Sequence, residues 1–526
     1  MGKSIGKYSG WLTGVRVRQN LKKLFSSRIE TIYNNQQRNF LACQRSTQKS
    51  MDKLSELRRT KIVCTLGPAS GGETLSALIS AGMNVARLNF SHGTQAEHGE
   101  RIDQIRLTSL KVGRPVAILQ DLAGPKIRVG EIRPEPVILV PEQIFTLTSR
   151  PVMGHHDGCA VNTPELIEAT PVDATVLLAD GALELRVVAK SADTLTCRVI
   201  VGGPLSSHKG VNLPGVTLPI SAFTAKDRDD LAFGLKHEVD FVAQSYVRSA
   251  ADVTEVKEFI AGHGLETPVI AKIEKQEGLD RIQEILAVAD GIMVARGDLG
   301  VETPLKMVPI AQKRLIWAAN QVGKPVITAT QMLASMVDNP RPTRAEATDV
   351  ANAILDGTDA VMLSEETAIG KYPVEAVRFL DDMARTTEAK IPYSDWLHHR
   401  SKFVSHTIPD AISFAACEMA RDLEAKAILA STASGATARL ISRFRPEVPI
   451  IAITTQRTTK KFLCLVWGVF PLFLEGLESV DQMLETVKLM AVRQGYLTSG
   501  DRLVITAGTP LGTRGATNLI QADVII

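Results

Sequence analysis

From Thr60 onwards, short apolar runs rich in β-branched residues alternate with longer stretches of helical periodicity. Each apolar run ends in polar residues, a pattern typical of buried strands followed by helices. The expected strands are TKIVCTLG, NVARLNFS, PVAILQDL, DFVAQSYV, PVIAKIE, GIMVARG, PVITATQ and DAVMLSEE. Because eight such units follow one another, the pattern favours an α/β fold with a closed (β/α)8 TIM barrel over an open, doubly wound sheet.

This alternation is interrupted once and changes again towards the C-terminus. Between the third and fourth expected strands the chain has strand character, with a hairpin signal at Asp180-Gly181, which predicts a small inserted β-barrel domain. After the barrel, runs such as KAILAS and PIIAITT predict a separate C-terminal α/β domain. The expected limits are residues 58–123 and 221–397 for the barrel, 124–220 for the inserted domain and 398–526 for the C-terminal domain.

Charge divides the chain into a basic head and an acidic body. Residues 1–50 contain ten Lys or Arg residues and one acidic residue, so their formal net charge is +9. The rest of the chain has a net charge of −6, which gives +3 for the whole chain. The mildly acidic body gives no reason to expect nucleic-acid binding. The head is compatible with an organellar transit peptide, a disordered extension or sequence upstream of a start at Met51, and its composition favours the last two. We expect residues 1–57 to be a disordered basic extension.

Cysteine spacing and apolar run length indicate a soluble protein of a reducing compartment. The six cysteines are spread singly without a CxxC pair, which argues against a disulfide framework or a zinc site. The longest uncharged apolar stretch near the C-terminus, CLVWGVFPLFL, is shorter than the ~18 residues of a membrane span. We therefore expect a cytoplasmic protein without membrane contact, and organellar import by the head stays open.

Polar and charged residues gather where the expected strands end. In a closed barrel these ends face a common mouth. Residues two apart on a strand share a face, so Lys272 and Glu274 are expected to point the same way. The residues at the strand ends are Arg87, Asn89, Ser91, Asp121, Lys272, Glu274, Arg296, Gly297, Asp298, Gly300, Thr330 and Gln331.

This set of residues suits a metal ion and a phosphorylated anion. Glu274 and Asp298 follow neighbouring strands, and Mg²⁺ favours one or two carboxylates together with waters and substrate oxygens. Lys272 and Arg87 suit a phosphate, which together with a metal points to phosphoryl transfer. The structural alternatives are a salt bridge between Lys272 and Glu274 at the barrel rim, and Asp298 as a helix N-cap.

Several motifs of this chain resemble the pyruvate kinase family. They are TKIVCTLGPAS, NVARLNFSHG, GVNLPG, MVARGDLGVE, ITATQMLASM and the long block PRPTRAEATDVANAILDGTDAVMLSEETAIGKYP. The resemblance runs from about Arg58 to the C-terminus. It implies phosphate transfer from phosphoenolpyruvate to ADP, giving pyruvate and ATP in the last step of glycolysis. It also implies Mg²⁺ or Mn²⁺ as cofactor and a homotetramer as the usual assembly.

The resemblance further implies roles for individual residues. Glu274 and Asp298 would hold the divalent metal, and Lys272, Arg87 and Thr330 would be catalytic. The residues implied in substrate binding are Arg87, Lys272, Gly297, Asp298 and Thr330. The residues implied in nucleotide binding are Asn89, His92, Arg128 and Lys209, with the inserted domain closing over the nucleotide as a lid.

The stretch LQDLAGPKIRVG differs from family members that need potassium. In the family, the positions of Asn89, Ser91, Asp121 and the Leu122 carbonyl form a K⁺ site near the transferred phosphate. Members that need K⁺ typically read GPEIR, whereas this chain reads GPKIR. The ammonium of Lys126 is therefore expected to supply the charge, so that K⁺ is not required. The alternative, a solvated lysine after a proline, leaves the Asp121 site without a built-in cation.

The C-terminal domain of the family often binds a phosphorylated effector. The stretch STASGATAR offers Thr432, Ser434, Gly435 and Thr437 before an expected helix. Hydroxyls and N–H groups there suit a phosphate, and the alternative is a plain helix N-cap. The effector site is the interpretation we favour.

Two rival functions are weaker. Another phosphoenolpyruvate- or pyruvate-handling barrel, such as a lyase or mutase, has no need of an inserted lid with the KGVNLPG loop. An inactive metabolite-binding regulator would be expected to have lost a metal carboxylate or Lys272, and none of these is missing.

Overall fold

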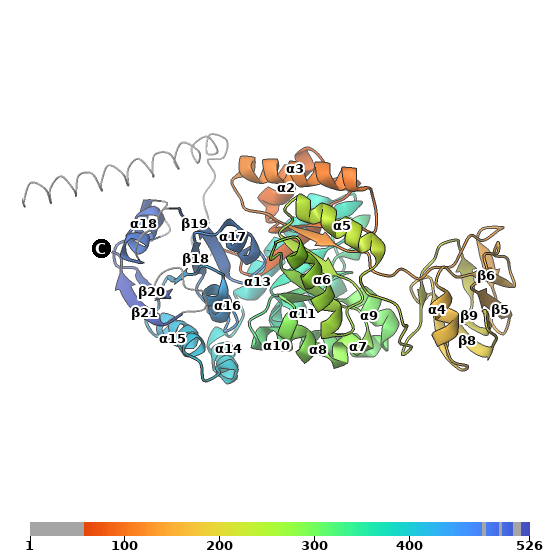
Figure 1. Ribbon diagram of the computed structural model, residues 1–526. Coiled ribbons are helices and arrows are strands. Elements are labelled where there is room, and N and C mark those ends of the chain that lie inside the picture. Colours follow the sequence, from red (N-terminus) through yellow and green to blue (C-terminus); the bar gives the residue numbers. More distant parts are fainter. Residues whose placement is uncertain (1–56, 476–479, 494–496, 509–516) are drawn as a thin grey trace, which may run out of the picture.

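The computed structural model describes residues 57–475, 480–493, 497–508 and 517–526. The expected disordered extension, Leu57 excepted, and the proposed start at Met51 lie outside the described residues. Figure 1 shows the barrel in the middle, with the C-terminal domain on one side of it and the inserted domain on the other.

The eight expected strands form a closed parallel barrel in the order β1-β16-β15-β14-β13-β12-β3-β2. The closure lies between β1 and β16, where Lys61 pairs with Ala360. This confirms the barrel and excludes the open, doubly wound sheet. The strands are β1 Lys61–Thr65, β2 Val85–Asn89, β3 Ala117–Asp121, β12 Phe241–Gln244, β13 Val269–Ile273, β14 Gly291–Ala295, β15 Val326–Ala329 and β16 Ala360–Leu363.

Helices follow the strands and cover the outside of the barrel (Figure 1). Thr94, Thr224 and Thr343 begin three of them, and each accepts a hydrogen bond from the backbone of a capping-box acid three residues later. The longer helices are α2 Glu73–Ala81, α3 Gln95–Val112, α5 Ala225–Lys236, α6 Ala250–Gly262, α8 Ile282–Val288, α10 Val308–Gln321, α11 Arg344–Asp356 and α13 Pro373–Glu388. The short ones are η2 Pro68–Ser70, α7 Gln276–Asp280, α9 Arg296–Glu302, η3 Leu305–Met307, η4 Ala334–Val337 and α12 Glu365–Ala368.

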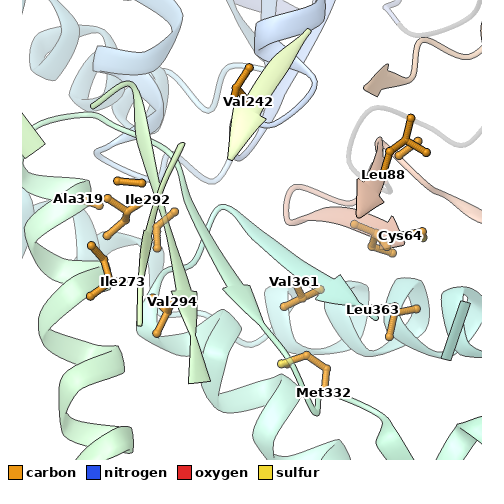
Figure 2. Close-up of a cluster of buried hydrophobic side chains, with 14 of the residues drawn as sticks. Cys64, Leu88, Val242, Ile273, Ile292, Val294, Ala319, Met332, Val361 and Leu363 are labelled. Carbon is orange, nitrogen blue, oxygen red and sulfur yellow. The ribbon is translucent and has the colours of Figure 1, made fainter. Parts of the chain in front are cut away.

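The barrel strands are buried on both faces, which explains their nearly continuous apolar runs. One face packs against the surrounding helices, as with Cys64, Ile292 and Val361 in Figure 2. The alternate residues fill the interior of the barrel with Val63, Val85, Ala117, Leu119, Phe241, Ala243, Ile270, Met293, Ile327, Ala329, Ala360 and Met362.

The inserted domain is a half-barrel. Its main sheet has six strands in the order β11-β7-β8-β9-β5-β6, and β10 pairs separately with β4. The expected β character is confirmed, but the sheet is not closed by hydrogen bonds because β4 and β10 pair with each other and not with the edge strands. The elements are β4 Val137–Leu139, β5 Ile144–Thr148, β6 Gly158–Ala160, α4 Pro164–Ala169, β7 Thr175–Leu178, β8 Leu183–Lys190, β9 Thr194–Val201, β10 Gly203–Leu205 and β11 Val211–Asn212.

The C-terminal domain is a five-stranded sheet in the order β19-β18-β17-β20-β21, in which only β21 runs antiparallel to its neighbour. This confirms the expected α/β domain. Its strands are β17 Ala427–Ser431, β18 Ile450–Thr454, β19 Val469–Phe473, β20 Arg502–Ala507 and β21 Leu519–Val524. Its helices, with the elements that lead into it, are α14 Tyr393–Arg400, η5 Ser401–Phe403, α15 Ile408–Asp422, α16 Ala436–Ser442, α17 Arg457–Leu463 and α18 Val480–Arg493.

The C-terminal domain closes the N-terminal end of the barrel. Phe462, Cys464 and Leu465, which we call the barrel floor, belong to the same hydrophobic cluster as the barrel interior. The rings of Phe462 and Phe241 have centroids 5.5 Å apart. The Lys61 ammonium, at the start of β1, donates to the Val469 carbonyl at 2.7 Å. The opposite, C-terminal end of the barrel is therefore the end left for chemistry.

Among the described residues, no helix has the length and apolarity needed to cross a lipid bilayer.

Candidate active site

A chain of ion pairs crosses the C-terminal mouth of the barrel. Arg87 Nε lies 2.6 Å from Asp121 Oδ2, and Lys272 Nζ lies 3.2 Å from Asp121 Oδ1 and 2.9 Å from Glu274 Oε1. All four residues are largely buried. The expectation that Lys272 and Glu274 point the same way is confirmed. The expected salt bridge between them exists, but inside the mouth and not at a solvated rim.

Burial and neighbouring charges shift the pKa values in this chain. Burial alone would lower the pKa of Lys272, but the Asp121 and Glu274 carboxylates outweigh it and hold that pKa above its usual value. Burial would raise the pKa of Asp121, yet Lys272 and Arg87 keep it below its usual value. Lys272 is therefore a fixed positive charge at the centre of the mouth.

Glu274 and Asp298 form a carboxylate pair suited to a divalent cation. Burial raises the pKa of Glu274, Lys272 opposes that rise, and the charge of Asp298 adds to it. The two carboxylates thus repel each other electrostatically, and a cation between them would relieve the repulsion. Asp298 is exposed, whereas Glu274 is 3% exposed. An all-oxygen donor set of this kind fits Mg²⁺ or Mn²⁺.

Ser245 is a buried polar residue of the mouth that the sequence pattern did not single out. Its hydroxyl accepts a hydrogen bond from Lys272 Nζ at 2.6 Å and donates to the Leu122 carbonyl at 2.8 Å. The next residue, Tyr246, donates its backbone N–H to Glu274 Oε2 at 2.9 Å. Ser245 directly follows the fourth barrel strand, a position that by itself does not distinguish it from other serines.

The turn after β15 is held in a strained conformation. Thr330 and Gln331 have φ angles of 65° and 54°, in the left-handed region that side chains rarely adopt. The Thr330 hydroxyl accepts a hydrogen bond from the Gly297 N–H at 2.8 Å. Arg296 fixes the turn by donating to the carbonyls of Ala329 at 3.1 Å and Thr330 at 2.6 Å. Gly297 and Thr330, both expected in substrate binding, are thereby brought together.

Helix α9 begins at Arg296, with Ala295 as its N-cap residue. The alternative interpretation of Asp298 as an N-cap is therefore wrong, because Asp298 lies in the first turn of the helix.

The residues expected to bind nucleotide come from the turn after β2 and from the inserted domain. Asn89 ends β2, and its Oδ1 accepts the Ser91 N–H at 3.1 Å, so both belong to one turn. His92 is exposed beside them, and burial together with the charges of Lys126, Arg128 and Arg87 lowers its pKa. Arg128 Nη1 donates to the His208 carbonyl at 3.0 Å, next to the exposed Lys209.

Lys126 lies near the acidic groups of the mouth without a direct ion pair to them. Burial and the charges of Arg128 and Lys272 lower its pKa, while Asp121 and Asp298 oppose that shift. Within the part of the chain that the structure describes, no carboxylate oxygen lies within 4.0 Å of its ammonium. The Leu122 carbonyl, expected in the monovalent-cation site, accepts from Ser245.

The inserted domain touches the barrel beside α9. Asn212 Nδ2, on β11, donates to Glu302 Oε1 at 3.0 Å, and Lys275 Nζ reaches the same oxygen at 3.1 Å. Arg248 donates to the carbonyls of Leu218 and Ile220, where the chain returns to the barrel.

The residues expected at an effector site lie after β17 and in the first turn of α16. Gly435 has a φ of 81°, and Thr432 and Thr437 are buried, with Ser434 half-buried. The Thr437 hydroxyl lies 2.6 Å from that of Thr517. Residues 509–516, which precede Thr517, lie outside the described residues, so the effector site stays a prediction.

Comparisons with known proteins assign the family. Residues 57–377 match the family described as "Pyruvate kinase, barrel domain", and residues 410–522 match "Pyruvate kinase, alpha/beta domain". The chain is 48% identical over 472 residues to a pyruvate kinase of Geobacillus stearothermophilus, a match that covers 89% of this chain and 80% of that protein. It is 50% identical over 473 residues to "Pyruvate kinase 2" of Synechocystis, covering 89% of this chain and 79% of that protein.

A solved structure agrees with these matches. The crystal structure of a pyruvate kinase from Cryptosporidium parvum has a TM-score of 0.85 and 36% sequence identity, and covers 90% of this chain and 97% of that one. With two matching family descriptions and relatives about half identical over most of its length, this chain belongs to the pyruvate kinase family.

Proposed function

We propose that the mouth of the barrel transfers a phosphoryl group from phosphoenolpyruvate to ADP, giving pyruvate and ATP. The observation that carries this proposal is the buried chain Arg87–Asp121–Lys272–Glu274, with Asp298 beside it. It combines fixed cations for a phosphate with carboxylates for a metal. Phosphoryl transfer depends mainly on positioning and on charge neutralisation of this kind.

Glu274 and Asp298 would hold Mg²⁺ or Mn²⁺. When bound, the metal supplies positive charge to the oxygens of the substrate. Glu274 is ready for this role because the Tyr246 N–H and Lys272 fix both of its oxygens. Asp298 sits on the first turn of α9, from which its exposed carboxylate reaches the mouth.

Lys272 and Arg87 would hold the phosphoryl group during its transfer. Lys272 is charged at every physiological pH because two carboxylates raise its pKa. Its ammonium is aimed by three partners, namely Asp121, Glu274 and Ser245, so little reorganisation is needed when negative charge moves. Ser245 acts through Lys272 and is therefore a positioning residue.

The substrate carboxylate would meet backbone N–H groups at Gly297 and Asp298 and the hydroxyl of Thr330. The hydrogen bond from the Gly297 N–H to the Thr330 hydroxyl brings both groups to one point of the mouth, and the substrate carboxylate would replace the hydroxyl as acceptor of that N–H. Thr330 would also take part in protonating the enolate after the phosphoryl group has left.

The inserted domain, proposed as residues 124–220, would close over the nucleotide. Asn89, His92 and Arg128 would contact ADP from the mouth, and Lys209 from the lid. Closure excludes water, which otherwise competes with ADP for the phosphoryl group. Within the described residues, the polar contacts of this domain with the barrel include Asn212 to Glu302 and Thr217 to Glu277, which are few enough to suit a domain that opens and closes.

Potassium would not be required. Lys126, Arg128, Arg87 and Lys272 place four cations around the three carboxylates of Asp121, Glu274 and Asp298. Asp121 already has a cation on each oxygen, from Arg87 and Lys272. Lys126 adds a covalently attached positive charge where a monovalent cation would otherwise be needed.

The cytoplasmic location, the homotetramer and a phosphorylated effector at Thr432–Thr437 remain proposals that follow from the family resemblance.

The proposal is tested by assaying pyruvate formation from phosphoenolpyruvate and ADP with Mg²⁺. Activity must depend on all three components, and the assay is repeated with sugar phosphates or AMP to detect an effector. Absence of ADP-dependent pyruvate formation from folded protein would refute the proposed function.

A further inference from the structure

The turn that leads into β6 gathers three exposed metal-binding side chains. They are His155, His156 and Asp157, whose donor atoms all lie within 4.8 Å of one another. Asp157 Oδ2 lies 3.1 Å from His156 Nε2 and 3.8 Å from His155 Nδ1. We infer that this turn is a binding site for a first-row transition-metal ion such as Zn²⁺, separate from the carboxylates of the barrel mouth.

The spacing of the donor atoms matches a tetrahedral ion. Zn²⁺ binds nitrogen and oxygen at about 2.0–2.1 Å, which places neighbouring ligand atoms of a tetrahedron about 3.4 Å apart. The two distances to Asp157 Oδ2, 3.1 and 3.8 Å, lie on either side of that value. His155 Nδ1 accepts the Asp157 N–H at 3.2 Å, so the exposed His155 ring must rotate to give a nitrogen to the ion. Three protein ligands leave a fourth position for water, as in exchangeable sites.

The backbone of this turn is fixed before any ion binds. His155 and Gly158 exchange two hydrogen bonds, at 2.9 and 3.3 Å. On β5, Thr146 donates its N–H to the Asp157 carbonyl at 2.9 Å, and the Gln143 amide donates to the His156 carbonyl. A Cβ on Gly158 would meet Thr146 Oγ1 at 2.0 Å, so the two strands approach closely there. Binding therefore orders only three short side chains, which lowers its entropic cost.

The donor set distinguishes this site from the barrel mouth. Two imidazoles and one carboxylate suit Zn²⁺, Ni²⁺ or Cu²⁺, whereas Mg²⁺ prefers oxygen ligands. In the ranges that the structure describes, this is the one group of three or more such side chains whose donor atoms converge. An excess of Mg²⁺ should therefore occupy the mouth and leave the turn to the softer ion.

The position of the turn separates it from catalysis. Strand β6 is at one edge of the six-stranded sheet, and β11, which carries the contact to Glu302, is at the other. Substitutions at His155 or His156 should therefore leave the rate of pyruvate formation unchanged, and the test does not depend on the proposed function.

The test is equilibrium dialysis of the full chain against Zn²⁺ in excess Mg²⁺. We expect one Zn²⁺ per chain, with a dissociation constant raised roughly tenfold or more by His156→Ala, because even second-sphere partners of a metal contribute that much. The matched control is His398→Ala with His399→Ala. These are also adjacent exposed histidines, with ring centroids 6.1 Å apart, and lie on α14 outside any converging group. The control should bind Zn²⁺ like the unaltered chain.

A second measurement identifies the ligands. With Cu²⁺ in place of Zn²⁺, electron paramagnetic resonance should show hyperfine splitting from two nitrogens, and from one nitrogen in His155→Ala. Zn²⁺ binding that is unchanged by His156→Ala, or absent from the unaltered chain in Mg²⁺, would overturn the inference.

Discussion

Asp121 is the residue on which the cations of the barrel mouth converge. Arg87 takes one of its oxygens at 2.6 Å and Lys272 the other at 3.2 Å, and the side chain is almost fully buried. A buried carboxylate with two cations is anchored, since removing either partner leaves charge uncompensated. Lys126 acts on this group through space and not through a direct bond. Its role is therefore electrostatic, and it can be tested by charge reversal.

Lys126→Glu should lower activity in buffers free of K⁺ and NH₄⁺ and restore it when K⁺ is added. The substitution turns four cations and three carboxylates into three cations and four carboxylates around the mouth. A monovalent cation would offset the added negative charge. The measurement is the initial rate in tetramethylammonium buffer with increasing K⁺, with Lys111→Glu, an exposed site on α3, as control. Strong stimulation of the unaltered chain by K⁺ would contradict the role of Lys126.

Asp298→Ala should lower turnover by orders of magnitude and raise the Mg²⁺ concentration needed for half-maximal rate, because a carboxylate that we propose holds the metal is lost. Asp298 is exposed, so the fold should be retained, as circular dichroism and thermal unfolding would show. Glu274, in contrast, is 3% exposed and bonded to Tyr246 and Lys272. At Glu274 the matching substitution is Glu274→Gln, which removes the charge and keeps the size of the side chain. Near-normal turnover in Asp298→Ala would refute the proposed metal site.

Ser245→Ala should lower kcat by roughly tenfold or more, since hydrogen bonds to charged groups contribute about 1.5–3 kcal/mol. The hydroxyl orients the Lys272 ammonium and does not reach substrate in our proposal, so KM for phosphoenolpyruvate should change less than kcat. Ser245→Cys, which keeps a weak donor and acceptor, should recover part of the loss. A rise in KM with unchanged kcat would show that Ser245 binds substrate and does not position Lys272.

Much of this site could be expected from the sequence, because strand ends in a barrel face one mouth. Arg87, Asp121, Lys272 and Glu274 were found in that way. Ser245 was not, since a serine after a strand has no distinguishing local signal. The bond from the Tyr246 N–H to Glu274 was also hidden, because Tyr246 follows β12 and lies 28 residues away in the chain.

The turn after β15 depends on an ion pair between α9 and α11. Arg296 Nη1 lies 2.8 and 2.6 Å from the two oxygens of Asp349, on α11, and the rest of its guanidinium holds the carbonyls of Ala329 and Thr330. The two partners are 53 residues apart in the chain, so no sequence pattern indicates the pairing. This ion pair keeps Thr330 in its left-handed conformation. Such a conformation costs of order 1–3 kcal/mol of folding free energy, which the surrounding contacts must offset.

Asp349→Asn should therefore lower kcat/KM for phosphoenolpyruvate by about tenfold while leaving the chain folded. The loss follows from a less fixed Arg296 and a Thr330 hydroxyl that no longer stays on the Gly297 N–H. The measurement is steady-state kinetics with thermal unfolding as the check on folding. Asp382→Asn, an exposed acid on α13, is the control and should behave like the unaltered chain. Equal kinetics in both variants would show that Arg296 holds the turn without Asp349.

Secondary structure followed the sequence where burial imposed a clear pattern. All eight barrel runs were expected correctly, because strands buried on both faces are continuously apolar. The half-barrel was not expected, because whether β4 pairs with β10 or with a sheet edge depends on long-range register, which leaves no local trace. The left-handed Thr330 was likewise unexpected, since threonine rarely adopts that conformation.

The barrel floor joins the C-terminal domain to the barrel interior. Leu465 is fully buried in the same cluster as Val63, Phe241 and Met293. Leu465→Ala should destabilise the chain by about 2–5 kcal/mol, the usual range for a large-to-small core substitution. Urea unfolding is the measurement, and Leu107→Ala, at a position 54% exposed, is the control and should have little effect. A shift limited to the C-terminal domain, with the barrel transition unchanged, would contradict a shared core.

This sharing has a consequence for how members of the family could exchange parts. The sequence predicts a domain limit at residue 398, yet the side chains of the barrel floor and those at the strand starts, such as Phe241, belong to one hydrophobic cluster. In a chimera of this barrel with the C-terminal domain of a relative, the side chains at the interface between them would not fit unless the residues on both sides came from the same protein. Substitutions at Phe241 and Phe462 are thus constrained to change together, although these two residues stand more than two hundred positions apart in the chain.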